Sequence, residues 1–492
     1  ETVLKSICLE GIRMLEKLQP QNVFYFFEEM TKIPHGSGNE KAISDYLVNF
    51  AKERGLEVIQ DDILNVIIKA PGTDGYENAP TVIIQGHMDM VCEKTKNSTH
   101  DFMKDPLKLR IDGDYVYATD TTLGSDDGIA VAYGLAVIDS KDVAHGPIEL
   151  VVTISEETGM DGAAALDTSV LNGKILLNID SEEEGIFLVS CAGGVNTIAN
   201  IKAEWEPFNG TALKLEVSGL NGGHSGMEII KQRANANKLM GRLLYILSKE
   251  VEFNIVSVNG GTKHNAIARD CEAIITVLEN DFKKVMDICK NTEEIFKSEY
   301  RVEDPNVSVS TEKVQSSERQ LTKCATNNVV NFMVAVPDGV QTMSKDIEGL
   351  VESSLNYGVL VTTDSEVKST LAVRSSVKSK REAIVDKIEC IVKVNGGAIV
   401  NENEYPAWEY EEDSKIRDLC VETYKKLFDK EPQINAIHAG LECGLLKEKM
   451  KDTEMISFGP ALMDVHTANE HMSISSVARM WNFLIELLKE IK

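Results

Sequence analysis

Three short, almost continuous apolar runs constrain the fold of this chain more than any other feature of its sequence. They lie at residues 82–84, 148–154 and 175–179, and each is followed within a few positions by His, Glu or Asp. Runs of this length are typical of strands buried on both faces, and a helical pattern at 128–139 lies between the first two. The pattern predicts an α/β fold with a mostly parallel central sheet. Ligands of such sheets bind beyond the carboxyl ends of the strands, where these polar residues fall.

The chain is predicted to form two domains, because 492 residues exceed the size at which a single core stops growing. Residues 24–70 indicate a helix, a loop, a second helix and a strand. After about residue 190, amphipathic strands and helices indicate an α+β segment. A Gly-Gly pair and a Tyr-Pro near 396–408 mark a second boundary. We expect an α/β domain built from residues 1–190 and 400–492, with an α+β domain inserted over 191–399.

Composition excludes several classes of protein. The net charge of −27 and the absence of a long basic run argue against nucleic-acid binding. The longest strongly apolar run, 129–138, is far shorter than the roughly 20 residues that cross a bilayer. The nine cysteines show no C-x-x-C spacing, which indicates reduced thiols in the cytoplasm. The N-terminal stretch carries charges at 10, 16 and 17 and is predicted to be a helix rather than a signal peptide.

The first polar cluster is Gly86-His87-Met88-Asp89, directly after the first apolar run. In an extended chain His87 and Asp89 project to the same side, so Asp89 can hold the imidazole in one tautomer, as carboxylates do for metal-binding histidines. The alternative is an ordinary strand end with a hydrogen-bonded histidine.

Two further acidic pairs follow the same pattern. Asp126-Asp127 precedes the helical pattern, where Asp127 is expected to cap the helix and Asp126 to point across the strand ends. Glu156-Glu157 ends the second apolar run. Because adjacent side chains diverge, one glutamate can ligate a metal while the other faces a water. The alternative for the glutamates is a solvated surface pair.

The remaining candidate ligands are Asp180, after the third run, and the histidines at 466 and 471 near the C-terminus. Since no cysteine occurs in these motifs, the ligand set is imidazole and carboxylate, which suits Zn²⁺, Mn²⁺ or Co²⁺.

Taken together, these motifs resemble the M20 metallopeptidases with two metals, and are most similar to the aminoacyl-histidine (Xaa-His or β-alanyl-histidine) dipeptidases. The resemblance covers nearly the whole chain, in the same order and with the same spacing. It rests on residues 86–91, 121–128, 155–159, 178–180, 221–226, 265–267, 438–444 and 466–471.

The resemblance implies two divalent metal ions per chain, with zinc expected and manganese or cobalt as alternatives. One ion would be held by His87 and Asp180, and the other by Glu157 and His466, with Asp126 bridging them. Glu156 would be the general base that acts on a metal-bridging water, and Asp89 would support His87. The family usually reads His-Ser/Thr-Pro-Asp-Glu at the last ligand, whereas this chain has Ala468-Asn469 in place of Pro-Asp, so His471 stays an alternative ligand.

The resemblance also implies substrate contacts in the inserted domain. His224 resembles a histidine that polarises the scissile carbonyl, and Asn265, Arg374 and Gly440 match substrate-binding positions. From the residues alone, His224 reads equally well as a turn residue and Arg374 as one half of a surface ion pair. His438 is assigned to the core, and no role is given to the histidines at 35, 100, 145 and 264.

The implied protein is a cytoplasmic metallodipeptidase that hydrolyses dipeptides with a free amino end, including Xaa-His and β-Ala-His. Its first domain would be catalytic, and the inserted domain would be a lid that supports a homodimer. Two alternatives remain: another M20 amidohydrolase, such as an aminoacylase, deacetylase or tripeptidase, and a catalytically silent peptide-binding protein.

Overall fold

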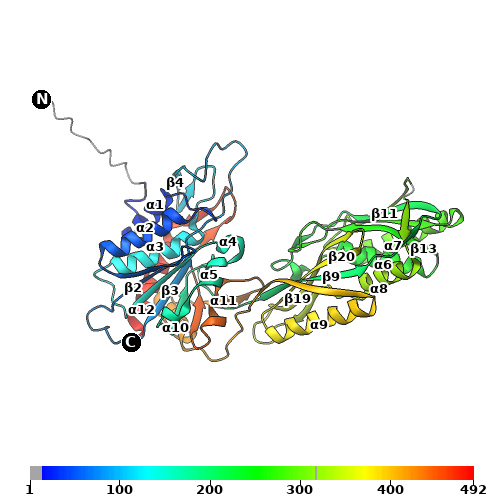
Figure 1. Cartoon of the computed structure of the whole chain (residues 1–492). Coiled ribbons are helices and arrows are strands. Elements are labelled where there is room, and N and C mark those ends of the chain that lie inside the picture. Colours follow the sequence, from blue (N-terminus) through cyan, green and yellow to red (C-terminus); the bar gives the residue numbers. More distant parts are fainter. Residues whose placement is uncertain (1–13, 316–317) are drawn as a thin grey trace. The chain divides into compact units, whose positions relative to one another are not determined.

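The computed structural model describes residues 14–315 and 318–492. The chain divides into two compact units (Figure 1). Unit 1 comprises the residues up to Val189 together with Glu411–Asn435 and Leu445–Lys492, and unit 2 comprises Ser190–Tyr410 and Ala436–Gly444.

The centre of unit 1 is a sheet with the strand order β1-β2-β6-β3-β7-β23-β8-β22. Its four central strands β6, β3, β7 and β23 pair in parallel, while β1, β2 and β8 pair antiparallel. The predicted α/β fold is therefore confirmed, and the three apolar runs form β6, β3 and β7 in its centre. The strands are β1 (Glu57–Gln60), β2 (Val66–Ala70), β3 (Val82–His87), β6 (Ile148–Thr153), β7 (Ile175–Asn178), β8 (Ile186–Cys191), β22 (Gln433–Ile437) and β23 (Glu454–Ser457).

Helices pack against this sheet, and α3 lies on β3 and β6. The residues of α3 from Ile129 to Val137 are all buried, which explains why its sequence is apolar on every side. The helices of this part of the chain are α1 (Gln21–Thr31), α2 (Lys41–Glu53), α3 (Ser125–Asp139), α4 (Glu156–Gly159), α5 (Asp161–Ala165), η1 (Thr168–Val170), α10 (Lys415–Phe428), α11 (Glu442–Lys449) and α12 (Ile474–Glu490).

The helix predicted for the N-terminal stretch falls partly on residues 1–13, which lie outside the described residues. The described part, 14–20, forms turns and bends instead. Because Pro20 disfavours the helical conformation at Gln19, the first described helix begins only at Gln21.

A smaller sheet of unit 1 joins strands from distant parts of the chain in the order β24-β25-β5-β4. Its strands are β4 (Leu109–Asp112), β5 (Tyr115–Ala118), β24 (Leu462–Met463) and β25 (His471–Ser473). The loop between β24 and β25 carries His466.

Unit 2 is built on a nine-stranded sheet with the order β16-β11-β15-β13-β19-β20-β9-β21, in which β18 also pairs with β19. All of the pairings between these strands are antiparallel. The strands are β9 (Gly193–Lys202), β11 (Thr211–Ser218), β13 (Phe253–Gly260), β15 (Cys271–Val277), β16 (Ser308–Lys313), β18 (Gly339–Met343), β19 (Val351–Thr362), β20 (Glu366–Ser375) and β21 (Gly397–Tyr405).

The helices of unit 2 pack on this sheet over one continuous apolar core. They are α6 (Ala236–Ser248), α7 (Phe282–Glu299), α8 (Lys323–Ala335) and α9 (Lys378–Val394), and the unit also has the short turns η2 (Ile229–Lys231) and η3 (Glu279–Asp281). Two small ribbons complete the unit: β10 (Trp205–Pro207) with β17 (Arg319–Leu321), and β12 (Gly223–His224) with β14 (Ala266–Ile267).

The second boundary expected from the sequence lies at residue 399, within β21. This strand pairs with β9 from Gly397 to Tyr405, so the chain stays in the sheet of unit 2 until the Tyr405-Pro406 pair. Among the described residues, no helix is long and apolar enough to cross a membrane.

Candidate metal centre

His87 ends the central strand β3 and is buried, with 1% of its side chain exposed. Its Nδ1 lies 3.0 Å from the backbone oxygen of Asp89 and 3.4 Å from the Oδ1 atom of the same residue. Asp89 therefore holds Nδ1, as the two-residue spacing predicts. The other nitrogen, Nε2, is left to face the carboxyl ends of the neighbouring strands.

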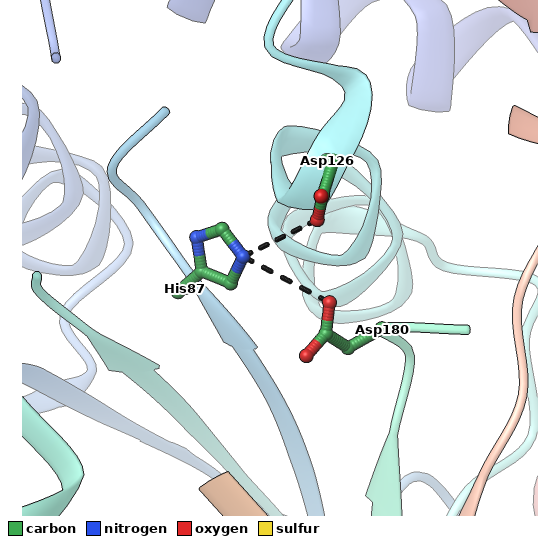
Figure 2. Close-up of side chains that lie close together, drawn as sticks. All are labelled: His87, Asp126 and Asp180. Carbon is green, nitrogen blue, oxygen red and sulfur yellow. Dashed lines mark ion pairs between the residues drawn. The ribbon is translucent and has the colours of Figure 1, made fainter. Parts of the chain in front are cut away.

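Three carboxylates from different elements surround Nε2 of His87. Oδ1 of Asp126 lies at 3.3 Å, Oδ1 of Asp180 at 3.8 Å and Oε2 of Glu156 at 4.0 Å. Figure 2 shows Asp126 and Asp180 both reaching the same imidazole nitrogen of His87. Because parallel strands end at one edge of the sheet, residues almost a hundred positions apart meet here.

The start of α3 sets the direction of Asp126. Gly124 has a left-handed backbone with φ of +67°, and Asp126 and Asp127 have non-helical backbone angles. The prediction that Asp127 caps the helix is wrong. Its Oδ2 accepts the backbone N–H of His87 over 3.3 Å, because the non-helical turn directs this buried carboxylate toward β3.

The two glutamates after β6 are held by Asp89. Its Oδ1 accepts the backbone N–H of Glu156 over 3.0 Å, and its Oδ2 lies 3.4 Å from that of Glu157. Only 18% of the Glu156 side chain and 7% of the Glu157 side chain are exposed, so the alternative of a solvated surface pair is wrong. Asp89 also accepts the hydroxyl of Ser37 over 2.7 Å, a contact that the sequence did not predict.

His466 reaches the same cluster from the loop between β24 and β25. Its Nε2 lies 3.1 Å from Oδ2 of Asp126 and 3.0 Å from Oε1 of Glu157. Hydrogen bonds to these two carboxylates raise the pKa of His466 to about 11. The structure thus brings His466 within hydrogen-bond distance of two of the other predicted ligands.

His471, the alternative ligand, lies elsewhere. Its ring stacks on Tyr117 with the centroids 4.7 Å apart, and its Nδ1 contacts the backbone oxygen of Asn469 at 2.8 Å. It belongs to none of the described groups of side chains that could hold a metal.

Burial and charge act in opposite directions on the acids of the cluster. Burial raises the pKa of Asp126, but hydrogen bonds to His466 and His87 outweigh it, and the net pKa lies below the ordinary value. Burial raises the pKa of Asp180 well above its ordinary value, and the charge of Asp127 adds to this effect. Burial lowers the pKa of His87, but the carboxylates of Asp126 and Asp89 raise it well above its ordinary range.

This set of side chains fits a pair of divalent cations. Five carboxylates lie around the imidazoles of His87 and His466, namely those of Asp89, Asp126, Glu156, Glu157 and Asp180. Negative charge is therefore in excess at a largely buried site, where a cation would offset it. Three groups have ligand atoms within 4.8 Å of one another. The groups are His87 with Asp126 and Asp180, His87 with Glu156 and Glu157, and Asp126 with Glu157 and His466.

Sequence reasoning missed Glu470. This residue is only 3% exposed, and its carboxylate accepts hydrogen bonds from the loop that leads into α3, including the backbone N–H of Ser125 over 2.7 Å. Its position four residues after His466 was the available signal, but the two partners are 345 positions apart in the chain.

The residues expected to bind substrate lie in unit 2. His224 and Ala266 pair in the β12–β14 ribbon, and the backbone oxygen of Asn265 accepts the N–H of Ser225 over 2.9 Å. Arg374, on β20, donates to the Tyr405 hydroxyl over 2.8 Å, so the alternative of a surface ion pair is wrong.

Two further residues of this region come from the loop after β22. His438 is buried, as predicted, with its Nε2 at 2.7 Å from the Ser354 hydroxyl. Burial and the charge of Arg374 lower the pKa of His438 to about 3. Gly440 lies between β22 and α11.

Comparison with known proteins identifies several relatives. The profile of "Peptidase family M20/M25/M40" matches residues 83–490. The chain is 38% identical over 479 residues to the cytosol non-specific dipeptidase of Escherichia coli (strain K12), which covers 97% of this chain and 99% of that protein.

Among solved structures, the aminoacylhistidine dipeptidase from Vibrio alginolyticus matches with a TM-score of 0.91 and 36% identity, covering 97% of this chain and 98% of that one. The aminopeptidase PepT from Bacillus cereus shares the fold at a TM-score of 0.55 and 16% identity, covering 96% and 99% of the two chains. These matches confirm the resemblance found in the motifs.

Proposed function

The chain belongs to peptidase family M20, and we propose that it is a metal-dependent dipeptidase that cleaves dipeptides with a free amino end, Xaa-His and β-Ala-His among them. Peptide-bond hydrolysis follows from the family. The names of the relatives from Escherichia coli and Vibrio alginolyticus support a dipeptide substrate. The observation that carries the proposal is the meeting of His87, Asp126, Glu157, Asp180 and His466 around one buried acidic site, with Glu156 beside them.

We assign the metal ligands from these positions. His87 and Asp180 would hold one ion, Glu157 and His466 the other, and Asp126 would bridge them through its two oxygens. These oxygens support the assignment, because Oδ1 faces His87 at 3.3 Å and Oδ2 faces His466 at 3.1 Å. The imidazole and carboxylate donors suit Zn²⁺, with Mn²⁺ or Co²⁺ as alternatives.

Two bound cations would supply a Lewis acid and a water whose pKa is lowered toward neutrality. The remaining chemistry belongs to the side chains. Glu156 would take the proton from the attacking water and deliver it to the departing amine. Its backbone N–H donates to the Asp89 carboxylate, and the backbone oxygen of Asp89 contacts Nδ1 of His87, so one buried aspartate orients both the base and a ligand. Glu157, one residue later, would stay on the metal.

Unit 2 would complete the site with groups that act on the substrate. We propose that His224 donates a hydrogen bond to the scissile carbonyl oxygen and that Asn265, Arg374 and Gly440 bind the substrate ends. Unit 2 would then act as a lid, and as the surface through which a homodimer forms. We also infer a cytoplasmic location, which the name of the Escherichia coli relative and the free cysteines of the described residues support.

A substrate panel tests the function. Purified protein loaded separately with Zn²⁺, Mn²⁺ or Co²⁺ would be offered Xaa-His dipeptides, other dipeptides, N-acetylated dipeptides and tripeptides. We expect dipeptides with a free amino end to be cleaved and N-acetylated ones to be left intact. Faster cleavage of tripeptides or acylated substrates than of any dipeptide would instead identify another amidohydrolase of the family. No cleavage with any of the metals would contradict an enzymatic function.

A further inference from the structure

The carboxylate of Glu470 is buried and accepts five hydrogen bonds from a single loop. Its Oε2 accepts the backbone N–H groups of Leu123 over 2.8 Å and Gly124 over 3.2 Å. Its Oε1 accepts the N–H of Ser125 over 2.7 Å, the hydroxyl of Ser125 over 2.7 Å and the N–H of Asp126 over 3.4 Å. A buried carboxylate satisfied in this way fixes the backbone that surrounds it.

That loop carries Asp126, the predicted bridge between the metals. The backbone of Asp126 has φ of −88° and ψ of +105°, so the regular geometry of α3 does not hold it. Hydrogen bonds to Glu470 fix the backbone of this loop in place of the regular hydrogen bonds of a helix. Because Asp126 would contact both ions, a small change in its backbone would alter both sites.

Glu470 also belongs to the loop that carries His466, a predicted ligand of the second metal. Glu470 lies in the β24–β25 loop with His466, and its own N–H donates to the backbone oxygen of Thr467 over 3.1 Å. Glu470 therefore joins two segments more than 300 positions apart, and the two side chains that these segments carry, Asp126 and His466, approach to 3.1 Å.

We propose that Glu470 is a positioning residue that fixes Asp126 relative to His466 and so sets the affinity of the centre for its second metal ion. The inference rests on the proposed function, because it takes these two residues as ligands. Glutamine at this position keeps the size of the side chain. Its NH₂ group, however, would face backbone N–H donors at one of the two carboxylate positions, so the loop would have to move.

A matched control is available near the opposite end of strand β6. Glu149 is also buried, at 2% exposed, and accepts the backbone N–H groups of Asn172 at 2.9 Å and Gly173 at 3.0 Å. It lies near the start of β6, whereas Thr153 at the end of that strand pairs with His87. Glu149→Gln thus removes the same kind of interaction away from the metal ligands.

Titration of the metal-free full-length protein with Co²⁺, followed by its visible absorption, tests the proposal. Wild type is expected to bind two ions, and Glu470→Gln to bind the second about 10–100-fold more weakly, the usual effect of losing a partner of a metal ligand. Glu149→Gln should bind both ions like wild type. Ser125→Ala, which removes one hydroxyl donor without a change of charge, should show a smaller loss, and Glu470→Asp a partial one.

Three outcomes would overturn the inference. The first is Glu470→Gln binding two Co²⁺ ions with wild-type affinity and spectrum. The second is an equal loss in Glu149→Gln, which would show a general effect of destabilisation. The third outcome applies if Glu470→Gln does not fold: both Ser125→Ala and Glu470→Asp then bind Co²⁺ with unchanged affinity. A wild-type protein that binds no second Co²⁺ would contradict the proposed function itself, and the inference with it.

Discussion

The backbone N–H of Gly226 donates a hydrogen bond to Nδ1 of His224 over 3.2 Å, and the N–H of Met227 approaches the same nitrogen at 3.1 Å. Because Nδ1 accepts, the proton of the neutral ring lies on Nε2. Burial lowers the pKa of His224, and the positive charge of Arg374 lowers it further. His224 is therefore neutral at pH 7 and presents Nε2–H as a donor, the form required to stabilise a carbonyl oxygen.

This geometry predicts the tautomer of His224. In ¹⁵N-histidine-labelled protein at pH 7, the Nδ1 resonance of His224 should have the shift of an unprotonated nitrogen, and the Nε2 resonance that of a protonated one. His224→Gln identifies the signals by their loss. A proton found on Nδ1 would contradict the assignment of Nε2–H as the donor. Replacement by alanine should lower kcat by about 10²–10³-fold, as for other donors to a developing oxyanion.

The neighbouring glutamates should differ in what their replacement removes. Glu156→Gln should keep both metals and lose nearly all turnover, because an amide of the same size cannot accept the proton of a water. Glu157→Gln should lose metal, because its carboxylate contacts His466 at 3.0 Å and is assigned as a ligand. Elemental analysis and dipeptide turnover, measured on the same preparations, check both expectations.

The exposed Glu183 provides the control for these two variants. Glu183→Gln makes the same change of charge three residues after Asp180 and should alter neither metal content nor turnover. Substantial turnover in metal-loaded Glu156→Gln would show that another group is the base.

Metal binding should depend steeply on pH. In the metal-free protein, hydrogen bonds to Asp126 and Glu157 raise the pKa of His466 from 6.5 to about 11. The ring is therefore still protonated at pH 7 and 8, where an imidazole with the ordinary pKa is mostly neutral. A bound metal requires the neutral ring, so binding releases this proton. Zn²⁺ affinity should therefore rise about tenfold per pH unit for each proton released.

Calorimetric titrations at pH 7 and 8, in buffers with different heats of ionisation, measure the protons released. We expect two Zn²⁺ ions and at least one proton released. A stoichiometry that stays at one ion under saturating conditions would count against Asp126 as a bridge. Affinity independent of pH would show that His466 is not a ligand.

The central sheet could be predicted because its strands are buried on both faces. Strands of this kind have continuous apolar sequences, as β3, β6 and β7 do. The edge strand β1 (Glu57–Gln60) was missed for the opposite reason. It is short, and both of its terminal residues are exposed, so its pairing with β2 leaves little trace in the hydrophobic pattern.

The approach of His87, Glu156 and Asp180 could be predicted, since each ends or closely follows a strand of the central sheet, and their roles as ligands and base stay predictions. What could not be predicted is how loops from distant segments support these side chains. Asp127 looked like a helix cap because it precedes an apolar helical pattern, yet the non-helical turn sends it to the backbone of His87. The Glu470 carboxylate accepts hydrogen bonds from backbone N–H groups and one hydroxyl of residues 123–126, and no local sequence pattern encodes such partners.

The last prediction asks which copy of the chain supplies His224. We hypothesise that, in a homodimer, the metals of one chain receive His224 of the partner subunit. Two inactive variants, His224→Ala and Glu156→Gln, would be mixed under conditions that exchange subunits. A heterodimer then has one site with an intact base and an intact histidine, so equal mixing should restore about a quarter of wild-type activity if dimers form at random.

A second mixture tests the same hypothesis by a loss of activity instead of a recovery of activity. Wild type exchanged with the double variant His224→Ala/Glu156→Gln would form heterodimers with no complete site if the histidine acts across the dimer. Activity should then fall to about a quarter of that of wild type at the same total chain concentration, whereas a histidine acting within its own chain would leave about half. Verified heterodimers that show no recovery in the first mixture and half activity in the second would assign His224 to its own chain. The metal chemistry would be the same in either case, because every predicted ligand and Glu156 lie in unit 1.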